Sequence, residues 1–68
     1  MVNIPKLKGK IAERGISQND LRELWGYKTR QVVSSKVNGR KPITLDEAQR
    51  FAEFAHLTDN EKVEIFFS

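Results

Sequence analysis

The segment 17–38 constrains the fold most, because it contains two short helical patterns joined at Gly26. Apolar residues recur at positions i, i+3 and i+4 on both sides of this glycine, which is the spacing of an amphipathic helix. They are Leu21, Leu24 and Trp25 before it, and Val32, Val33 and Val37 after it. Ser17 is a good N-cap for the first helix, and Gly26 suits the left-handed residue that often ends one. The sequence therefore predicts two helices connected by a tight turn.

The second of these helices carries polar and basic residues beside its apolar stripe. They are Lys28, Arg30, Gln31, Ser34, Ser35 and Lys36. Two short helices joined by a turn that contains glycine form a helix-turn-helix. Such a helix fits the major groove of B-DNA, where side chains near its N-terminus reach the base edges. The segment therefore predicts a reader of double-stranded DNA whose second helix spans about residues 29–38.

Candidate base-contacting residues lie at the start of this second helix. Arg30 can form a bidentate hydrogen bond to a guanine, while Thr29 and Val33 offer methyl groups to a thymine. Gln31 matches adenine in the same way. We rank it lower, because its side of the helix is expected to face the first helix.

Three further helical patterns flank this segment. Residues 5–14 begin with Pro5, which suits the first position of a helix. Thr44 and Thr58 are each followed three residues later by a glutamate, which predicts a capping box at the start of two more helices. Residues 62–67 also alternate apolar and polar side chains, so a strand there remains an alternative.

The expected fold is all-α. We expect one domain over residues 1–68, a compact bundle of four to five helices that contains a helix-turn-helix at about 17–38. Its core is expected to consist of Leu7, Ile11, Leu21, Trp25, Val32, Val37, Ala48, Phe51 and Phe66.

Phe54 and Ile65 fall off the inward stripes of their helices. They either complete the core or form an exposed apolar patch, which usually marks an interface. A single helix-turn-helix contacts only a half-site, and two-fold dimers solve that problem. We therefore expect a homodimer, weak in solution or formed on DNA, that uses residues 54–67 and in particular Phe54 and Ile65.

The charge is divided unevenly along the chain. Residues 1–41 hold ten Lys and Arg and three Asp and Glu, a net charge of +7, whereas residues 42–68 have a net charge of −4. Such a division indicates one surface for an anionic polymer. Phosphate contacts are expected from Gln18, at the start of a helix, and from Lys6, Lys10, Arg40 and Lys41. Lys8, Arg14 and Lys36 are expected to be solvated.

Several other classes of function find no support in the sequence. The chain has no cysteine, so disulfides and thiolate sites are excluded. It has no apolar run of the length of a membrane span or signal peptide, and we expect a cytoplasmic protein. His56 is the one histidine, and the carboxylate pairs at 46–47 and 59–61 occupy first helical turns, where the helix dipole favours them. We therefore expect no enzyme, no metal and no cofactor.

One family resemblance covers nearly the whole chain, from about Leu7 to Phe67. It rests on Ser17, Gln18, Leu21, Gly26, Val32 and the turn Asn38-Gly39-Arg40-Lys41-Pro42. With this spacing the chain resembles the phage repressor and Cro family of lambda-repressor-like helix-turn-helix domains. The resemblance implies a transcriptional regulator of a phage or prophage, located with the DNA of a bacterial or infected cell.

The resemblance also implies roles for individual residues. Base contacts would come from Lys28, Thr29, Arg30 and Ser34. Gln18 would contact a phosphate and the second helix, and Asn38, Arg40 and Lys41 would hold the sugar–phosphate backbone. Three positions depart from the family pattern, namely Arg22, Lys28 and Val33.

Two alternatives to a DNA-binding regulator remain. The acidic C-terminal half is also compatible with an antitoxin-like or antirepressor-like module that binds a protein and touches DNA secondarily. RNA binding is disfavoured, because the chain has one tyrosine and one tryptophan for stacking on bases.

Overall fold

Five α-helices form the protein in a computed structural model that describes residues 2–67, and no strand occurs in that range. The helices are α1 (Ile4–Glu13), α2 (Gln18–Trp25), α3 (Arg30–Val37), α4 (Leu45–Phe54) and α5 (Asp59–Phe66). The all-α prediction is thus confirmed. The strand alternative for residues 62–67 is wrong, since α5 continues to Phe66.

Local side-chain chemistry fixes most helix starts. Three helices begin with a reciprocal capping box, in which a hydroxyl accepts from the N3 amide and the N3 carboxylate accepts from the N-cap amide. The pairs are Ser17 with Asp20, Thr44 with Glu47 and Thr58 with Glu61. Thr29 occupies the N-cap position of α3, but its side chain makes no capping hydrogen bond.

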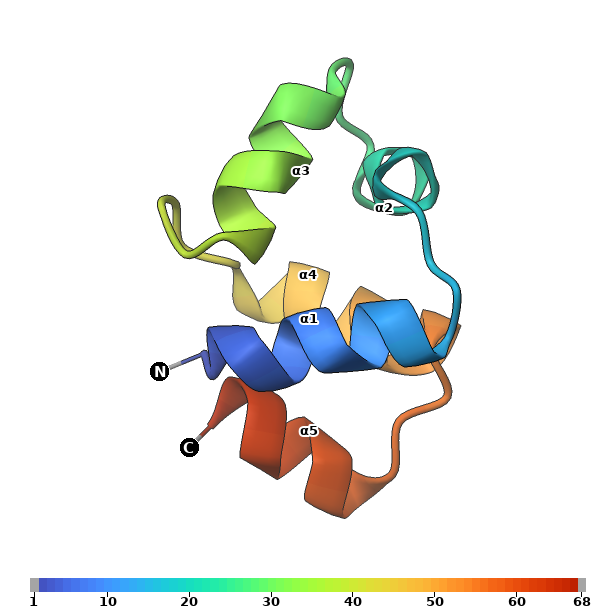
Figure 1. Ribbon diagram of the computed structural model, residues 1–68, viewed down its shortest axis with the longest axis vertical. Coiled ribbons are helices and arrows are strands. Elements are labelled where there is room, and N and C mark those ends of the chain that lie inside the picture. Colours follow the sequence, from blue (N-terminus) through green and yellow to red (C-terminus); the bar gives the residue numbers. More distant parts are fainter. Residues whose placement is uncertain (1, 68) are drawn as a thin grey trace.

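The helices are distributed along the longest axis of the molecule, which is vertical in Figure 1. Helices α2 and α3 lie toward one end, and α1 and α5 lie side by side toward the other. The core between them includes Leu7, Leu21, Val33 and Phe51, each with no exposed surface. The rings of Phe51 and Phe66 meet edge to face with centroids 6.0 Å apart, which ties α4 to α5.

The rotation of α3 about its axis differs from the expected one. Val33, Lys36 and Val37 face the core, at the spacing i, i+3 and i+4. Val32 is only partly buried, so its assignment to the core in place of Val33 is wrong. Val33 has no exposed surface and therefore does not offer its methyl groups to DNA. Lys36 is buried too, so its assignment to a solvated face is also wrong.

The two candidate interface residues have different environments. Ile65 is 3% exposed and belongs to the core, so its assignment to a dimer interface is wrong. Phe54 is 44% exposed.

Within residues 2–67 there is no helix with the length and hydrophobicity needed to span a membrane.

Candidate nucleic-acid interface

The outer surface of α3 and the turn before it is polar and basic. Lys28, Thr29 and Arg30 are exposed, and Ser34 is partly buried. Gln31 is also exposed, so the reason for ranking it lower does not hold. The N-terminal half of α3 thus presents several hydrogen-bonding side chains to the solvent.

Two arginines donate to carbonyl oxygens at the end of α2 and in the turn that follows it. The Nη1 atom of Arg22 donates to the carbonyl oxygen of Tyr27 at 3.1 Å, while Nη1 of Arg50 donates to that of Leu24 at 3.3 Å. Gly26 adopts a left-handed conformation with φ of 76°, as the sequence predicts. Arg22 therefore satisfies a carbonyl of the turn, which gives this residue a structural role.

The opposite end of α3 is closed by the turn at residues 38–41. The Nδ2 atom of Asn38 donates to the carbonyl oxygen of Ser34 at 2.8 Å. The amides of Arg40 and Lys41 both donate to the carbonyl oxygen of Ser35, at 2.8 and 3.2 Å. These bonds satisfy carbonyls at the helix end and leave the Arg40 and Lys41 side chains in the solvent.

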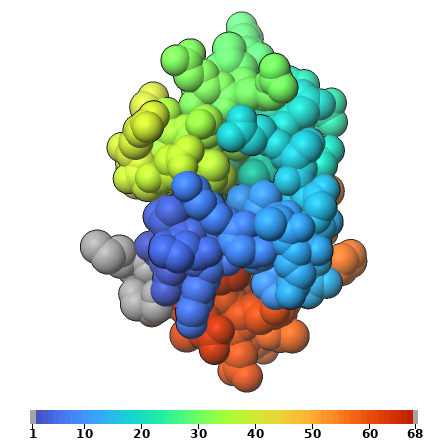
Figure 2. All heavy atoms as spheres, in the orientation of Figure 1, coloured from blue at the N-terminus to red at the C-terminus, as the bar shows by residue number. Residues whose placement is uncertain are grey.

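A lysine that we expected to be merely solvated lies at this surface. Lys8 of α1 lines a hollow together with Gln18, at the start of α2, and Asn38, at the end of α3. Figure 2 shows α1, the start of α2 and the end of α3 meeting on one face of the molecule. Lys8 therefore lies beside two of the candidate phosphate-binding residues.

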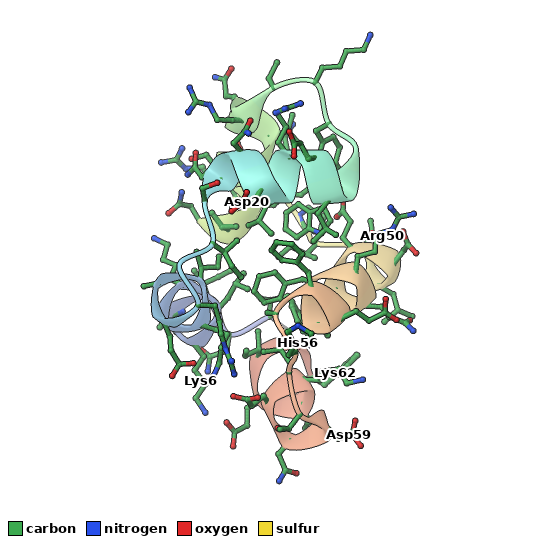
Figure 3. All side chains as sticks on the ribbon, turned by 90° about the vertical axis from the view of Figure 1, so that its right-hand side faces the viewer. Lys6, Asp20, Arg50, His56, Asp59 and Lys62 are labelled. Atoms are coloured by element: carbon green, nitrogen blue, oxygen red, sulfur yellow. The ribbon has the colours of Figure 1, made fainter. Side chains whose placement is uncertain are left out.

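Lys6 and Lys10, in contrast, face α5. The ammonium group of Lys10 binds the carboxylates of Glu13, at 2.7 Å, and Glu61. Lys6 lies 3.6 Å from Glu64 and is found at the α1–α5 end of the molecule (Figure 3). The expected phosphate contacts of Lys6 and Lys10 stay a prediction, and these ion pairs speak against them.

The pattern of ion pairing separates the basic residues into two groups. Seven of the twelve lie within 4.0 Å of a carboxylate: Lys6, Lys10, Arg14, Arg22, Lys36, Arg50 and Lys62. The other five have no such partner among residues 2–67, and they are Lys8, Lys28, Arg30, Arg40 and Lys41. Four of these five flank or begin α3, and Lys8 lies beside its end. No Asp or Glu occurs between residues 24 and 45.

Beneath this surface lies a buried ion pair between α3 and α4. The Nζ atom of Lys36 is 2.7 Å from Oε1 of Glu47, and each side chain is 9% exposed. Lys36 also donates to the carbonyl oxygen of Pro42 at 3.1 Å, and its Nζ lies 5.3 Å from the ring centroid of Tyr27. The hydroxyl of Tyr27 donates to Oε2 of Glu47. Among the described residues, no fully buried side-chain nitrogen or oxygen lacks a hydrogen-bond partner.

Both ionisable groups of the pair have shifted pKa values. Burial alone would raise the pKa of Glu47, but hydrogen bonds from Lys36, Tyr27 and the Thr44 amide outweigh it and lower that pKa. Burial alone would lower the pKa of Lys36, but its interactions with the neighbouring Glu47 and Tyr27 outweigh it and raise that pKa. The pair is therefore charged at neutral pH.

No protein-family model, no curated protein and no solved structure matches the chain significantly. The resemblance of residues 7–67 to the phage repressor and Cro family therefore stays a prediction. What can be said of function comes from the arrangement of the side chains.

Proposed function

We propose that the protein is a sequence-specific regulator that binds double-stranded DNA, with α2, the turn and α3 acting as a helix-turn-helix. One observation carries the proposal. Five basic residues have no carboxylate partner among residues 2–67, and all five lie around α3. Residues 24–45, which include α3 and the segments on either side of it, contain no Asp or Glu. Exposed, unpaired cations of this kind supply the electrostatic affinity for a phosphate backbone.

Base reading is assigned to the exposed N-terminal part of α3. Arg30 and Gln31 have the side chains that pair with guanine and adenine in a bidentate manner. Lys28 and Thr29 precede them in the turn, and Ser34 lies one helical turn further along. This placement matches a helix that enters the major groove with its N-terminus first.

Phosphate binding is assigned to the residues on either side of α3. Gln18 stands at the N-terminus of α2, where free amides favour an anion, and Lys8 lies in the same hollow. Asn38, Arg40 and Lys41 extend this surface to the loop after α3. By this assignment Lys8 takes the role that we first gave to Lys6 and Lys10.

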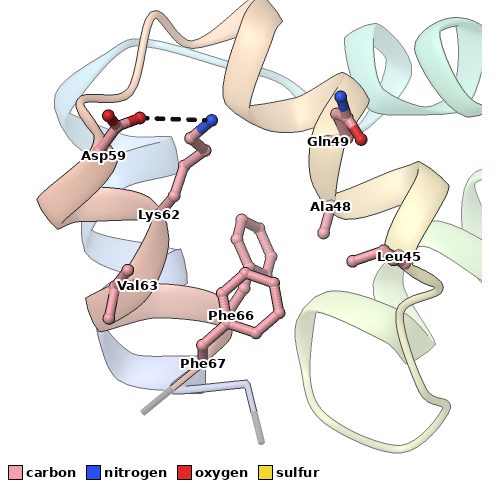
Figure 4. A pocket seen from close by; sticks show the side chains of 8 residues that line it. All are labelled: Leu45, Ala48, Gln49, Asp59, Lys62, Val63, Phe66 and Phe67. Carbon is pink, nitrogen blue, oxygen red and sulfur yellow. Dashed lines mark ion pairs between the residues drawn. The ribbon is translucent and has the colours of Figure 1, made fainter.

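A groove between α4 and α5 is proposed to bind a second copy of the chain (Figure 4). Leu45, Val63 and Phe67 line it and are 69%, 55% and 60% exposed. Its rim carries both Asp59 and Lys62, whose charged groups are 3.6 Å apart. In a two-fold dimer the same patch of each protomer faces its copy, so the acidic residue of one protomer can pair with the basic residue of the other. A protomer measures 31 × 21 × 20 Å, so two in contact have the size to reach successive major grooves about 34 Å apart.

An electrophoretic mobility shift against the DNA that flanks the protein's own gene, at a fixed salt concentration, tests the proposal. Retention of that DNA in the presence of excess mixed-sequence competitor supports a regulator of the repressor or Cro kind. Equal competition by all sequences contradicts it. Such a result, together with a bound protein partner, would favour an antitoxin-like or antirepressor-like interaction module instead.

A further inference from the structure

The Lys36–Glu47–Tyr27 cluster has no part in the interface just described, yet it joins α3 to α2, to α4 and to the segments on either side of α3. Glu47 lies in the first turn of α4 and accepts hydrogen bonds from the Thr44 amide, at 3.0 Å, and from Lys36. Its own carbonyl oxygen accepts from Nε1 of Trp25, in α2, at 3.0 Å. One residue is thereby bonded to α2, the turn before α3, α3 itself and the loop after it.

We propose that this cluster fixes the direction in which α3 projects and thereby sets how well the protein discriminates between DNA sequences. The inference rests on the proposed function and deepens it. Lys36 and Tyr27 are positioning residues here, since neither belongs to the outer surface of α3. Lys36 lies on the face of α3 opposite the proposed DNA-binding side, and Tyr27 lies in the turn that leads into the helix.

The geometry explains why direction, rather than mere attachment, depends on this cluster. Val33 and Val37 attach α3 through apolar packing, which is non-directional and tolerates small rotations. A charge-assisted hydrogen bond weakens when its distance or angle changes. Lys36 makes two hydrogen bonds on a buried face, so a rotation of α3 breaks contacts that water cannot replace.

The chain contains a matched control for Glu47. Glu61 is also the N3 residue of a capping box and also binds a lysine, but it joins α5 to α1 instead of α4 to α3. Glutamine serves a capping box as well as glutamate does, so Glu47→Gln and Glu61→Gln each keep the cap and remove one ion pair. Glu47→Gln removes an ion pair between α3 and α4, whereas Glu61→Gln removes one between α1 and α5.

The experiment compares both variants with the unchanged protein. Dissociation constants are measured at one salt concentration for the best-bound duplex and for mixed-sequence DNA. The discrimination ratio is the dissociation constant for mixed-sequence DNA divided by that for the best-bound duplex. We expect this ratio to fall about tenfold in Glu47→Gln, as it does when one bidentate base contact is misplaced. We expect Glu61→Gln to leave the ratio within about twofold, because its contacts lie away from the interface. Equal ratios in the two variants would overturn the inference.

Tyr27→Phe provides a milder variant that introduces no uncompensated charge, should Glu47→Gln fail to fold. It should lower the ratio in the same direction without changing affinity for mixed-sequence DNA.

Hydrogen exchange of the free protein separates this inference from the proposed function. The inference requires faster exchange of the α3 amides in Glu47→Gln and Tyr27→Phe, and faster exchange of the α5 amides in Glu61→Gln. If the unchanged protein shows no sequence preference, the proposed function fails, while a selective release of α3 still supports the positioning role. In Tyr27→Phe, which keeps the ion pair, an exchange change that is uniform across all helices would refute that role.

Discussion

Nζ of Lys36 lies 2.7 Å from Oε1 of Glu47, and this ion pair is almost wholly removed from solvent. It joins the middle of the chain to the start of α4 and crosses from the basic half of the sequence to the acidic half. A buried charge left without its partner is strongly unfavourable. The stability of the domain therefore depends on this pair as well as on its apolar core.

Lys36→Met is expected to destabilise the domain by roughly 3–5 kcal/mol, because it leaves the Glu47 carboxylate buried without its cation. That is a large share of the stability of a small domain. Urea denaturation followed by circular dichroism measures the change. Lys8→Met, at an exposed lysine, is the matched control and should change the free energy of unfolding by less than about 0.5 kcal/mol.

Lys8→Ala is expected to reduce the slope of log affinity for DNA against log salt by about 1, because one phosphate contact is lost. Lys10→Ala is expected to leave the slope unchanged, because the Lys10 ammonium is bound by Glu13 and Glu61. Fluorescence anisotropy at several salt concentrations gives both slopes. A lower slope for Lys10→Ala and an unchanged one for Lys8→Ala would reverse our assignment of the two lysines.

Arg30→Ala and Gln31→Ala are each expected to cost about 1–3 kcal/mol of discrimination at one base pair of the site. Affinity for mixed-sequence DNA should change little in Gln31→Ala, which removes no charge. Both side chains are exposed, so the melting temperature should stay the same. Competition with duplexes substituted one base pair at a time locates the affected position, and a uniform loss at all positions would identify a backbone contact.

The stability of the protein is expected to fall as the pH decreases from about 4.5 toward 2. Hydrogen bonds from Lys10 and from the Thr58 amide lower the pKa of Glu61 from 4.5 to about 2. A carboxyl group whose pKa is depressed in the folded state stabilises that state above its unfolded pKa, and the contribution is lost as the pH falls through the folded one. Melting temperatures across this range should decline less steeply in Glu61→Gln, and parallel declines would show that the ion pair contributes nothing.

Phe67→Ser is expected to prevent two protomers from binding one site, because Phe67 is an exposed wall of the α4–α5 groove. Phe54→Ser is the comparison variant, since Phe54 is exposed but lies outside this groove, and it tests our first expectation that Phe54 belongs to the interface. Sedimentation at micromolar concentration, with and without a bound duplex, measures the stoichiometry. Identical stoichiometries for the two variants would exclude the groove as the dimer interface.

The helices could be predicted from the sequence because their signals are local. Thr44 and Thr58 each carry a capping glutamate three residues later, and Gly26 takes the left-handed conformation that its position suggests. Such interactions involve residues within one turn of each other. They determine where a helix begins and ends, but not which side of it is buried.

The rotation of α3 and the roles of the α1 lysines could not be predicted, because both depend on contacts between distant segments. From the sequence alone Lys36 is expected at the surface, as most lysines are. It is buried because its ammonium group bonds to Glu47, eleven positions away in the sequence. Lys8 and Lys10 are indistinguishable by type. Their roles diverge because α5 brings Glu61 to one side of α1.

Selection of bound sequences from a randomised duplex library, at a fixed salt concentration, tests the account most directly. For the unchanged protein the account predicts enrichment of one short sequence, and for Arg30→Ala the loss of preference at one position within it. Recovery of the library with no enriched sequence, although the protein is folded, would contradict the claim that α3 reads DNA.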